Sequence, residues 1–402
     1  MTDRALLSTA AFLRALATGL IGVLLGVHLA TVGLDAKAIG LVVSAGLAGA
    51  ATASLIVTWL GARIGYRRSL IALALLAGLG GLGLLAGPHP WLLAAAAFAG
   101  MVNGMGRDRG AALILEQTLL PATVSDAKRT LAFAQYNVLQ DFGHALGGLL
   151  AGLPALLAAG GLTSQAEASG VTVVLYSLLS VLPLGAYAFL SRAATAARRE
   201  RVQLTPASRR ILWRISSLFA LDSLAGGFLT TALLSYFFHE RFGVGVEVIG
   251  PLFFAARTAN ALSHLAAAWL ARRIGLVNTM VFTHIPSSLL LITVAYAPSF
   301  PVAAALFLLR ESLVEMDVPT RQSYVMAVVR PEERAIASGV THLVRMGAWA
   351  VAPAFAGVLM SEASLMIPLV VGALMKVSYD LLLWRAFRHV RPPEEALQTV
   401  RG

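Results

Sequence analysis

The stretch Trp59-Leu60-Gly61-Ala62-Arg63-Ile64-Gly65 occurs a second time in this chain, as Trp269-Leu270-Ala271-Arg272-Arg273-Ile274-Gly275. The two copies lie 210 residues apart and share five of their seven residues. Each copy closes a long hydrophobic run. One copy alone could be an ordinary helix end that finishes in arginine and glycine, but the matched spacing favours a duplication. The repeat therefore predicts two homologous halves.

The composition indicates a membrane protein. Of the 402 residues, 58% are hydrophobic and only 13% are charged, which is more apolar than an ordinary soluble domain. A formal net charge of +11 would suit nucleic acid if the arginines formed one water-facing surface, but they lie between hydrophobic blocks. Cysteine is absent, which excludes disulfides and thiolate chemistry. We expect membrane lipids, and no nucleic acid, as partners.

Hydrophobic segments set the predicted topology. A membrane-spanning helix needs about 20 mostly apolar residues, and the sequence divides into twelve such segments. They cover residues 6–29, 38–60, 69–86, 91–115, 131–157, 171–190, 211–238, 246–270, 277–297, 301–328, 335–360 and 365–384. With the repeat, they predict an all-α membrane protein of twelve transmembrane helices in two pseudo-symmetric six-helix bundles.

The longest polar break lies in the middle of the chain and is rich in arginine. We therefore predict an N-terminal bundle at 1–190, a basic cytoplasmic linker at 191–210, a C-terminal bundle at 211–387 and a cytoplasmic tail at 388–402.

Basic residues predict the orientation, because cytoplasmic loops retain an excess of lysine and arginine. Alternate loops carry these residues, while the opposite loops offer only Lys37 and Arg241. The basic loop residues are Arg63, Arg67, Arg68, Lys128, Arg129, Arg272, Arg273, Arg330, Arg334, Arg385, Arg388 and Arg391. Both termini are expected in the cytoplasm of a bacterial cell, with the protein multi-pass in the inner (cytoplasmic) membrane.

The repeated stretch resembles the loop element of the major facilitator superfamily, which has the form G-x3-D-R-x-G-R-R after helix 2 and a weaker echo after helix 8. Thr58 replaces the leading glycine and Ala62 replaces the aspartate. The resemblance covers nearly the whole chain and implies the twelve-helix fold of that family. It also implies a cytoplasmic gate formed by Arg63, Gly65, Arg67, Arg68, Arg273 and Gly275. Near the cytoplasmic end of helix 4, Glu116 is the predicted carboxylate partner of the gate arginines.

Charged residues inside the predicted spans suggest a second kind of site, since an ionised side chain at the bilayer centre costs about 2.5 to 3.5 kcal/mol. Alignment of the halves places Arg14 in register with Asp222, and Asp141 with Arg345. The family fold places helix 1 near helix 5, and helix 7 near helix 11. We therefore predict the pairs Arg14–Asp141 and Asp222–Arg345. They are either proton or substrate switches, with Asp222 the first choice for proton coupling, or static ion pairs.

Further polar residues are candidates for the lining of a substrate cavity. Asp108 and Asp317 share the repeat offset, and Arg310, Asp317 and Arg321 fall on one helical stripe. Gln140 and His144 are spaced i, i+4 on helix 5. Structural pairing is the competing explanation for all of these residues. In the family, an arginine of helix 4 is linked to proton transfer, and Arg107 or Arg109 matches it. We expect His284 to be peripheral, and Lys376 and Asp380 to neutralise each other.

Glycines of helix 5 bear on the direction of transport. Gly143, Gly147 and Gly152, with Pro154, should permit close helix approach and bending. The family's antiporters carry a glycine- and proline-rich element in this helix, to which the match is partial.

The sequence contains no nucleotide-binding P-loop, no H-E-x-x-H and no G-x-S-x-G, and its histidines form no recognised metal spacing. We therefore predict no enzymatic activity, no cofactor and no metal. The predicted function is a monomeric secondary transporter that moves a small organic solute by alternating access, as a proton-coupled efflux antiporter. The alternatives are a symporter or uniporter that imports a metabolite, anionic metabolites included, and a membrane sensor or lipid-acting enzyme.

Overall fold

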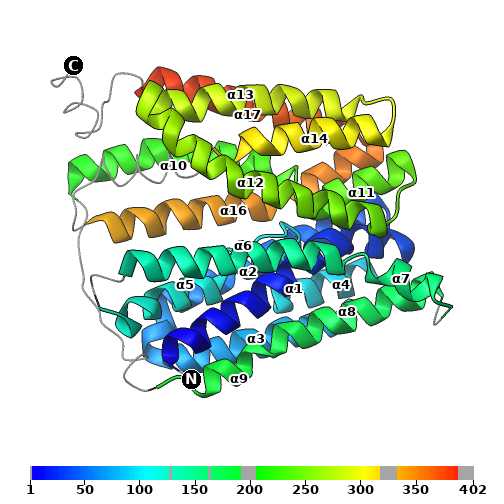
Figure 1. Cartoon of the computed structure of the whole chain (residues 1–402), viewed down its shortest axis with the longest axis horizontal. Helices are drawn as coiled ribbons and strands as arrows, with labels where there is room; N and C mark the ends of the chain where they lie inside the picture. The colour runs from blue at the N-terminus through cyan, green and yellow to red at the C-terminus, as the bar shows by residue number, and fades with distance from the viewer. Residues whose placement is uncertain (1, 126–128, 162–163, 192–204, 317–332, 388–402) are drawn as a thin grey trace. The chain divides into compact units, whose positions relative to one another are not determined.

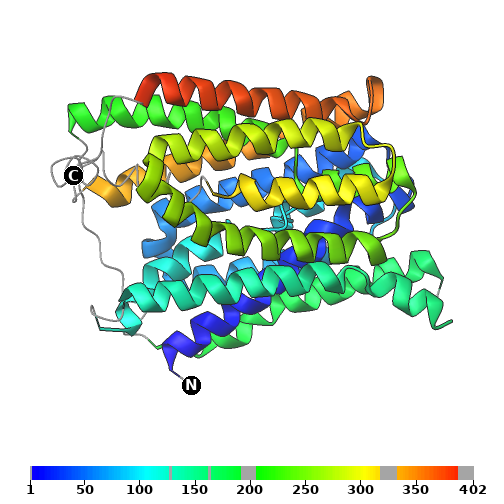
Figure 2. The same cartoon turned by 45° about the horizontal axis from the view of Figure 1, so that its top comes forward.

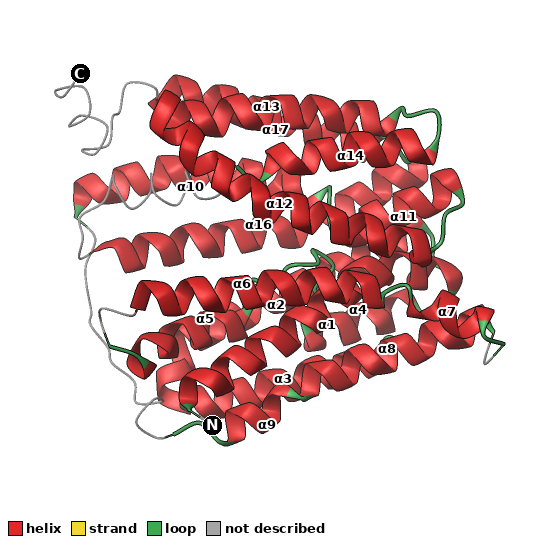
Figure 3. Cartoon of the chain, viewed as in Figure 1, coloured by secondary structure: helices red, strands yellow, loops and turns green. Residues whose placement is uncertain are grey.

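A computed structural model describes residues 2–125, 129–161, 164–191, 205–316 and 333–387. Within these ranges the regular secondary structure is entirely helical (Figure 3). The first half contains α1 Asp3–Thr31, α2 Ala36–Ile64, α3 Tyr66–Gly83, α4 Pro90–Gly100, α5 Ala111–Leu119, the 3-10 helix η1 Leu120–Thr123, α6 Arg129–Leu150, α7 Leu153–Ala159, α8 Gln165–Val181 and α9 Pro183–Ala188 (Figure 1).

The second half contains α10 Pro206–Gly227, α11 Thr231–Phe242, α12 Val246–Ile274, α13 Leu276–Ala295, α14 Phe300–Val314, α16 Arg334–Glu362 and α17 Ile367–Phe387. In the part of the chain that is described, eight helical stretches are long and apolar enough to cross a membrane. They are Asp3–Thr31, Ala36–Ile64, Leu131–Ala159, Glu167–Ala188, Ser208–Phe242, Val277–Ala295, Ile336–Glu362 and Ile367–Ala386. The all-α membrane class is thus confirmed, while the number of twelve spans stays a prediction.

The chain packs as two compact units. Unit 1 contains Met1–Arg199, Leu229–Phe254 and Ala350–Leu365, and unit 2 contains Glu200–Phe228, Ala255–Trp349 and Met366–Gly402. Unit 1 thus includes α11, the start of α12 and the end of α16 as well as the first nine α-helices. The predicted boundaries near residues 190 and 211 stay predictions.

The repeated stretch builds the same turn twice. Both α2 and α12 are 29 residues long, and they end at Ile64 and Ile274. The glycine that follows has φ of 96° at Gly65 and 86° at Gly275, a region open mainly to glycine. The N–H of Gly65 donates to the Gly61 carbonyl at 2.9 Å, and that of Gly275 to the Ala271 carbonyl at 3.0 Å. The two copies of the repeated stretch therefore have the same local backbone conformation.

The predicted span 91–115 is not one continuous helix. Helix α4 ends at Gly100 and α5 begins at Ala111, and between them Met101 and Gly106 have positive φ angles of 53° and 66°. Asn103 competes for the backbone here, because its side-chain N–H donates to the Arg107 carbonyl at 2.6 Å and its oxygen accepts from the Met105 N–H at 2.9 Å. Gly104, Gly106 and Asn103 therefore interrupt the helix, although the residues on either side are apolar.

Glycines on neighbouring helices make room for the segment between α4 and α5. A Cβ atom at Gly22 of α1 would collide with Gly106, and one at Gly46 of α2 would collide with the Val102 carbonyl. The first turn of α11, also in unit 1, donates to the segment: the Ala232 N–H bonds the Gly104 carbonyl at 3.0 Å. The glycines thus let α1 and α2 approach this segment, and α11 supplies a hydrogen bond to its backbone.

Helices α1 and α6 pack closely along their length (Figures 1 and 2). A Cβ at Gly147 would collide with the backbone of Leu16 and Leu20, and one at Gly143 would press on Ala15. The predicted close approach at these glycines is confirmed. The helix is interrupted where the bend is predicted, since α6 ends at Leu150 and α7 begins at Leu153, ahead of Pro154. The bend itself stays a prediction.

We expect Gly147→Ala to lower the thermal stability of the purified protein, because the new methyl group meets immobile backbone of α1. Gly185→Ala is the matched control, since a Cβ at Gly185 of α9 meets nothing within 4 Å. The control should be neutral, or stabilising by up to about 1 kcal/mol. Equal stabilities for the two variants would contradict the packing.

Candidate functional site

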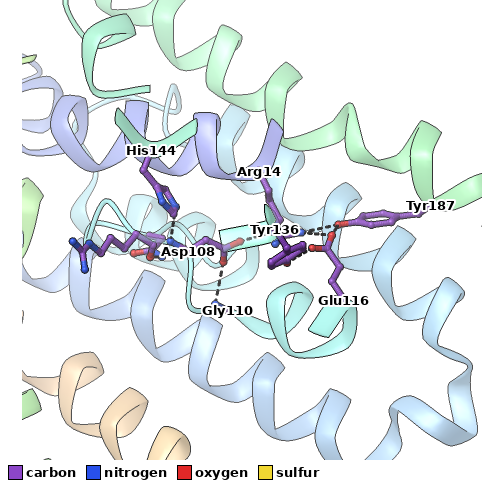
Figure 4. Close-up of polar contacts among 9 residues, drawn as sticks. Arg14, Asp108, Gly110, Glu116, Tyr136, His144 and Tyr187 are labelled. Atoms are coloured by element: carbon purple, nitrogen blue, oxygen red, sulfur yellow. Dashed lines mark hydrogen bonds and ion pairs between the residues drawn. The ribbon is translucent and has the colours of Figure 1, made fainter. Parts of the chain in front are cut away.

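Arg14 is the centre of a buried polar cluster in unit 1 (Figure 4). Its Nε lies 2.5 Å from Oδ2 of Asp108, and its Nη1 lies 2.5 Å from Oε1 of Glu116. The same Nη1 donates to the hydroxyl of Tyr187 at 2.8 Å. Helix α1 therefore presents one cation to two carboxylates, one from the segment between α4 and α5 and one from α5.

Glu116 is sealed from solvent. Its side chain has 0% exposure, and it accepts hydrogen bonds of 2.5 Å from the hydroxyls of Tyr136 on α6 and Tyr187 on α9. With the bond from Arg14, three donors face this carboxylate. That arrangement satisfies a buried charge by hydrogen bonds from three helices.

Asp108 is also held by His144 of α6 and by its own loop. Its backbone N–H donates to Nε2 of His144 at 2.8 Å, and its Oδ1 accepts from the Gly110 N–H at 3.1 Å (Figure 4). Because Nε2 acts as an acceptor, His144 is the neutral tautomer with its hydrogen on Nδ1. His144 therefore positions the backbone that carries Asp108.

The predicted pair between Arg14 and Asp141 is wrong. Asp141 is exposed, and the acids bound to Arg14 are Asp108 and Glu116. The reason is helical geometry: Gly143 faces α1, and two residues along a helix correspond to a rotation of about 200°. Asp141 therefore points away from α1.

The predicted role of Glu116 as partner of the gate arginines is also wrong, because its buried carboxylate binds Arg14. Arg63, Arg67 and Arg68 are exposed at the turn between α2 and α3. In unit 2, the Arg273 guanidinium lies 5.4 Å from the ring centre of Trp269, within the repeated stretch itself. The gate function of these residues stays a prediction.

Asp222 is the centre of a second buried cluster, in unit 2. Its Oδ1 lies 3.0 Å from Nζ of Lys376 and its Oδ2 lies 3.5 Å from Nη2 of Arg345. The predicted contact between Asp222 and Arg345 is confirmed. The Arg345 guanidinium also lies 4.8 Å from the ring centre of Trp349, so its position is fixed by an aromatic face as well as by the acid.

His284 extends this cluster to a second carboxylate. Its Nδ1 lies 3.0 Å from Oδ1 of Asp380, and its Nε2 lies 3.3 Å from Nζ of Lys376. The expectation that His284 is peripheral is wrong, because it lies between Lys376 and Asp380. The expected mutual neutralisation of Lys376 and Asp380 stays a prediction. The partners fit a histidine that donates from Nδ1 and accepts at Nε2. Asp222, Lys376, His284 and Asp380 thus form one continuous chain of polar contacts.

The remaining predicted cavity residues are only partly placed. Arg310 is buried and paired with its neighbour Glu311, which also accepts from Asn260 at 2.9 Å. Asp317 and Arg321 lie outside the described residues, so the predicted stripe is not tested. Gln140 is buried on α6. In the described part of the chain, no group of three or more possible ligand residues suits a metal ion.

Sequence reasoning missed part of the two clusters. Lys376 and Asp380 were recognised as charged residues of an apolar helix, but their contacts with Asp222 and His284 were not predicted. Tyr136 and Tyr187 carried no such signal, since tyrosine is common in buried helices and only the folded chain brings their hydroxyls to Glu116.

A cavity of about 80 Å³ adjoins the Arg14 cluster inside unit 1. Most of its wall is apolar, and its polar groups include Arg14 and Asp108. His144 and Gln140 do not line it.

Comparison with known proteins agrees with this architecture. A family model described as the Major Facilitator Superfamily matches residues 7–353, and the chain therefore belongs to that family. An uncharacterized membrane protein, YJR124C of Saccharomyces cerevisiae, is 24% identical over 416 residues, covering 95% of this chain and 93% of the yeast protein.

Solved structures of similar fold are those of transporters. The nucleoside transporter NupG has a TM-score of 0.74 at 16% identity, over 97% of this chain and 100% of NupG. A bacterial homologue of the human lysosomal transporter Spinster has a TM-score of 0.69 at 15% identity, over 96% of this chain and 94% of that one. A D-xylose-proton symporter has a TM-score of 0.65 at 14% identity, over 95% of this chain and 96% of the symporter. This protein is a multi-pass membrane protein with the fold of a transporter.

Proposed function

We propose that this protein is a proton-coupled secondary transporter that exports a small organic solute by alternating access. It crosses the cytoplasmic membrane twelve times with both termini in the cytoplasm, as the hydrophobic segments and the basic loops indicate. The observation that carries the proton coupling is the buried chain from Asp222 through Lys376 and His284 to Asp380.

This chain has the properties that a proton-handling site needs. Asp222 is 97% buried and Asp380 is 100% buried. A change in the charge of either carboxylate therefore has a large energetic effect on the packing of the helices around it. The ammonium group of Lys376 and the imidazole ring of His284 can each carry a proton and pass it along a hydrogen bond. A proton driven across the membrane supplies about 2.3 kcal/mol per 100 mV and about 1.4 kcal/mol per pH unit, which is comparable with the cost of opening one buried pair.

Export is supported by the glycine and proline content of α6 and α7. The close packing at Gly143 and Gly147 and the break before Pro154 resemble the helix 5 element of the family's antiporters. The rival is import of a metabolite by symport or uniport. Structural neighbours include a D-xylose-proton symporter, so this fold accommodates proton symport as well.

Vesicle orientation distinguishes the two directions. Everted membrane vesicles energised to an acidic, positive interior should accumulate the solute of a proton antiporter and lose it when an uncoupler is added. Right-side-out vesicles should accumulate the solute of an importer. Vesicles without the protein are the control. If purified protein in liposomes moved no solute from a metabolite and drug panel under any imposed gradient, the transporter proposal would fail in favour of a sensor or a lipid-acting enzyme.

A further inference from the structure

The cavity beside Arg14 has a charge balance that identifies its ligand class. Arg14 and Asp108 line it, with side-chain exposures of 15% and 8%, while Glu116 lies behind Arg14 with 0%. One guanidinium thus faces two carboxylates. His144 adds no charge, because its Nε2 accepts a hydrogen bond. The polar end of the cavity therefore carries more negative than positive charge.

Two further arginines are close to this site in sequence. Arg107 and Arg109 flank Asp108, but neither lines the cavity, and both make contacts of their own. The Nη2 atom of Arg14 has almost no exposed surface and no hydrogen-bond partner among the described residues. It therefore offers no donor to a molecule in the cavity. Asp108 is the carboxylate that lines the cavity, and it shares the single cation Arg14 with Glu116.

The rest of the wall suits a small alkyl group. Leu70, Leu73 and Ala77 of α3 line the cavity, together with the aromatic side chains of Tyr176 and Tyr187. A cavity of ~150 Å³ admits benzene, and the volume of about 80 Å³ here suits a molecule of a few heavy atoms. Tyrosine faces also attract cations.

We propose that this cavity binds a small organic ammonium ion of about the size of ethylammonium. The ammonium group donates to Asp108, and the alkyl group packs on Leu70 and Leu73. With the ligand bound, two positive charges face two carboxylates, and the cluster is neutral. A small carboxylate would add a third negative charge to the same buried space, which is unfavourable. Binding here is separate from the proposed proton coupling, because it lies in unit 1 and needs no gradient.

Thermal unfolding of the purified full-length protein in detergent tests the proposal. Ethylammonium chloride is compared with sodium chloride and sodium acetate at equal ionic strength. Ethylammonium should raise Tm in a saturable manner, by about 2 to 4 °C at about five times its Kd. Acetate and sodium chloride should not. A rise with acetate of equal size, or no saturable rise with ethylammonium, would overturn the proposal.

Two pairs of variants locate the binding. Ala77→Leu fills the cavity from α3, and Ala72→Leu adds the same volume at an exposed position of the same helix. Asp108→Asn removes the carboxylate, and Glu240→Gln neutralises an exposed acid of α11. The shift with ethylammonium should disappear in the first member of each pair and persist in the second. Because Ala77→Leu leaves the Arg14 ion pairs intact, persistence of the shift in this variant would refute the site even if Asp108→Asn does not fold.

Discussion

Arg14→Met is expected to abolish most of the folded protein. The variant keeps an unbranched apolar stem but leaves Asp108 and Glu116 buried without their cation. Breaking a buried ion pair by removing one partner costs about 3 to 5 kcal/mol, and one arginine here serves two acids. A domain is typically stable by only about 5 to 15 kcal/mol. The measurement is the yield of monodisperse protein after detergent extraction, together with its Tm.

The controls separate charge from side-chain shape. Arg4→Met removes a partly exposed arginine from the same helix, where it contacts Gln135 and no acid, and should leave the yield nearly unchanged. Adding Asp108→Asn and Glu116→Gln to Arg14→Met removes the uncompensated charges and should recover part of the yield. A wild-type yield for the single Arg14→Met variant would show that this cluster does not stabilise unit 1.

Asp222→Asn is expected to reduce proton-driven transport to the level of liposomes without protein. Asparagine keeps the size of the side chain but cannot exchange a proton, so the chain to Lys376 and His284 loses one end. Solute counterflow, which needs no net proton movement, should persist in part. The measurement is solute uptake under an imposed pH gradient, compared with counterflow in the same liposomes.

A charge-balanced variant separates this role from a structural one. The cluster holds the cations Arg345 and Lys376 and the acids Asp222 and Asp380, which are in balance. Asp222→Asn alone leaves one excess cation, whereas Asp222→Asn with Lys376→Met restores the balance. The double variant should fold better than the single one and still lack proton-driven transport. Recovery of proton-driven transport in the double variant would show that the ion pair is only structural.

The sequence showed the repeated stretch and predicted one ion pair correctly. Gly65 and Gly275 were identifiable because a glycine at a fixed place in a duplicated stretch indicates a backbone that only glycine adopts easily, and both have positive φ. The Asp222–Arg345 contact followed from reading the two halves in register. These features depend on local backbone conformation or on the duplication, and each of these two can be inferred from the amino-acid sequence.

The sequence by itself therefore determined the apolar helices, the duplication and the presence of buried charge. Only the tertiary structure decided which charges meet. Arg14 bonds Asp108 because α4 stops at Gly100, so the segment before α5 brings that carboxylate to α1. Asp141 does not pair with Arg14, because it lies on a face of α6 that is turned away from α1. His284 contacts Lys376 and Asp380 because α13 packs on α17. The physical reason is that the partner of a side chain depends on how its helix is rotated and on which helices pack against it. The hydrophobic pattern constrains the rotation and packing only weakly, because the helices of this chain are apolar on nearly every face.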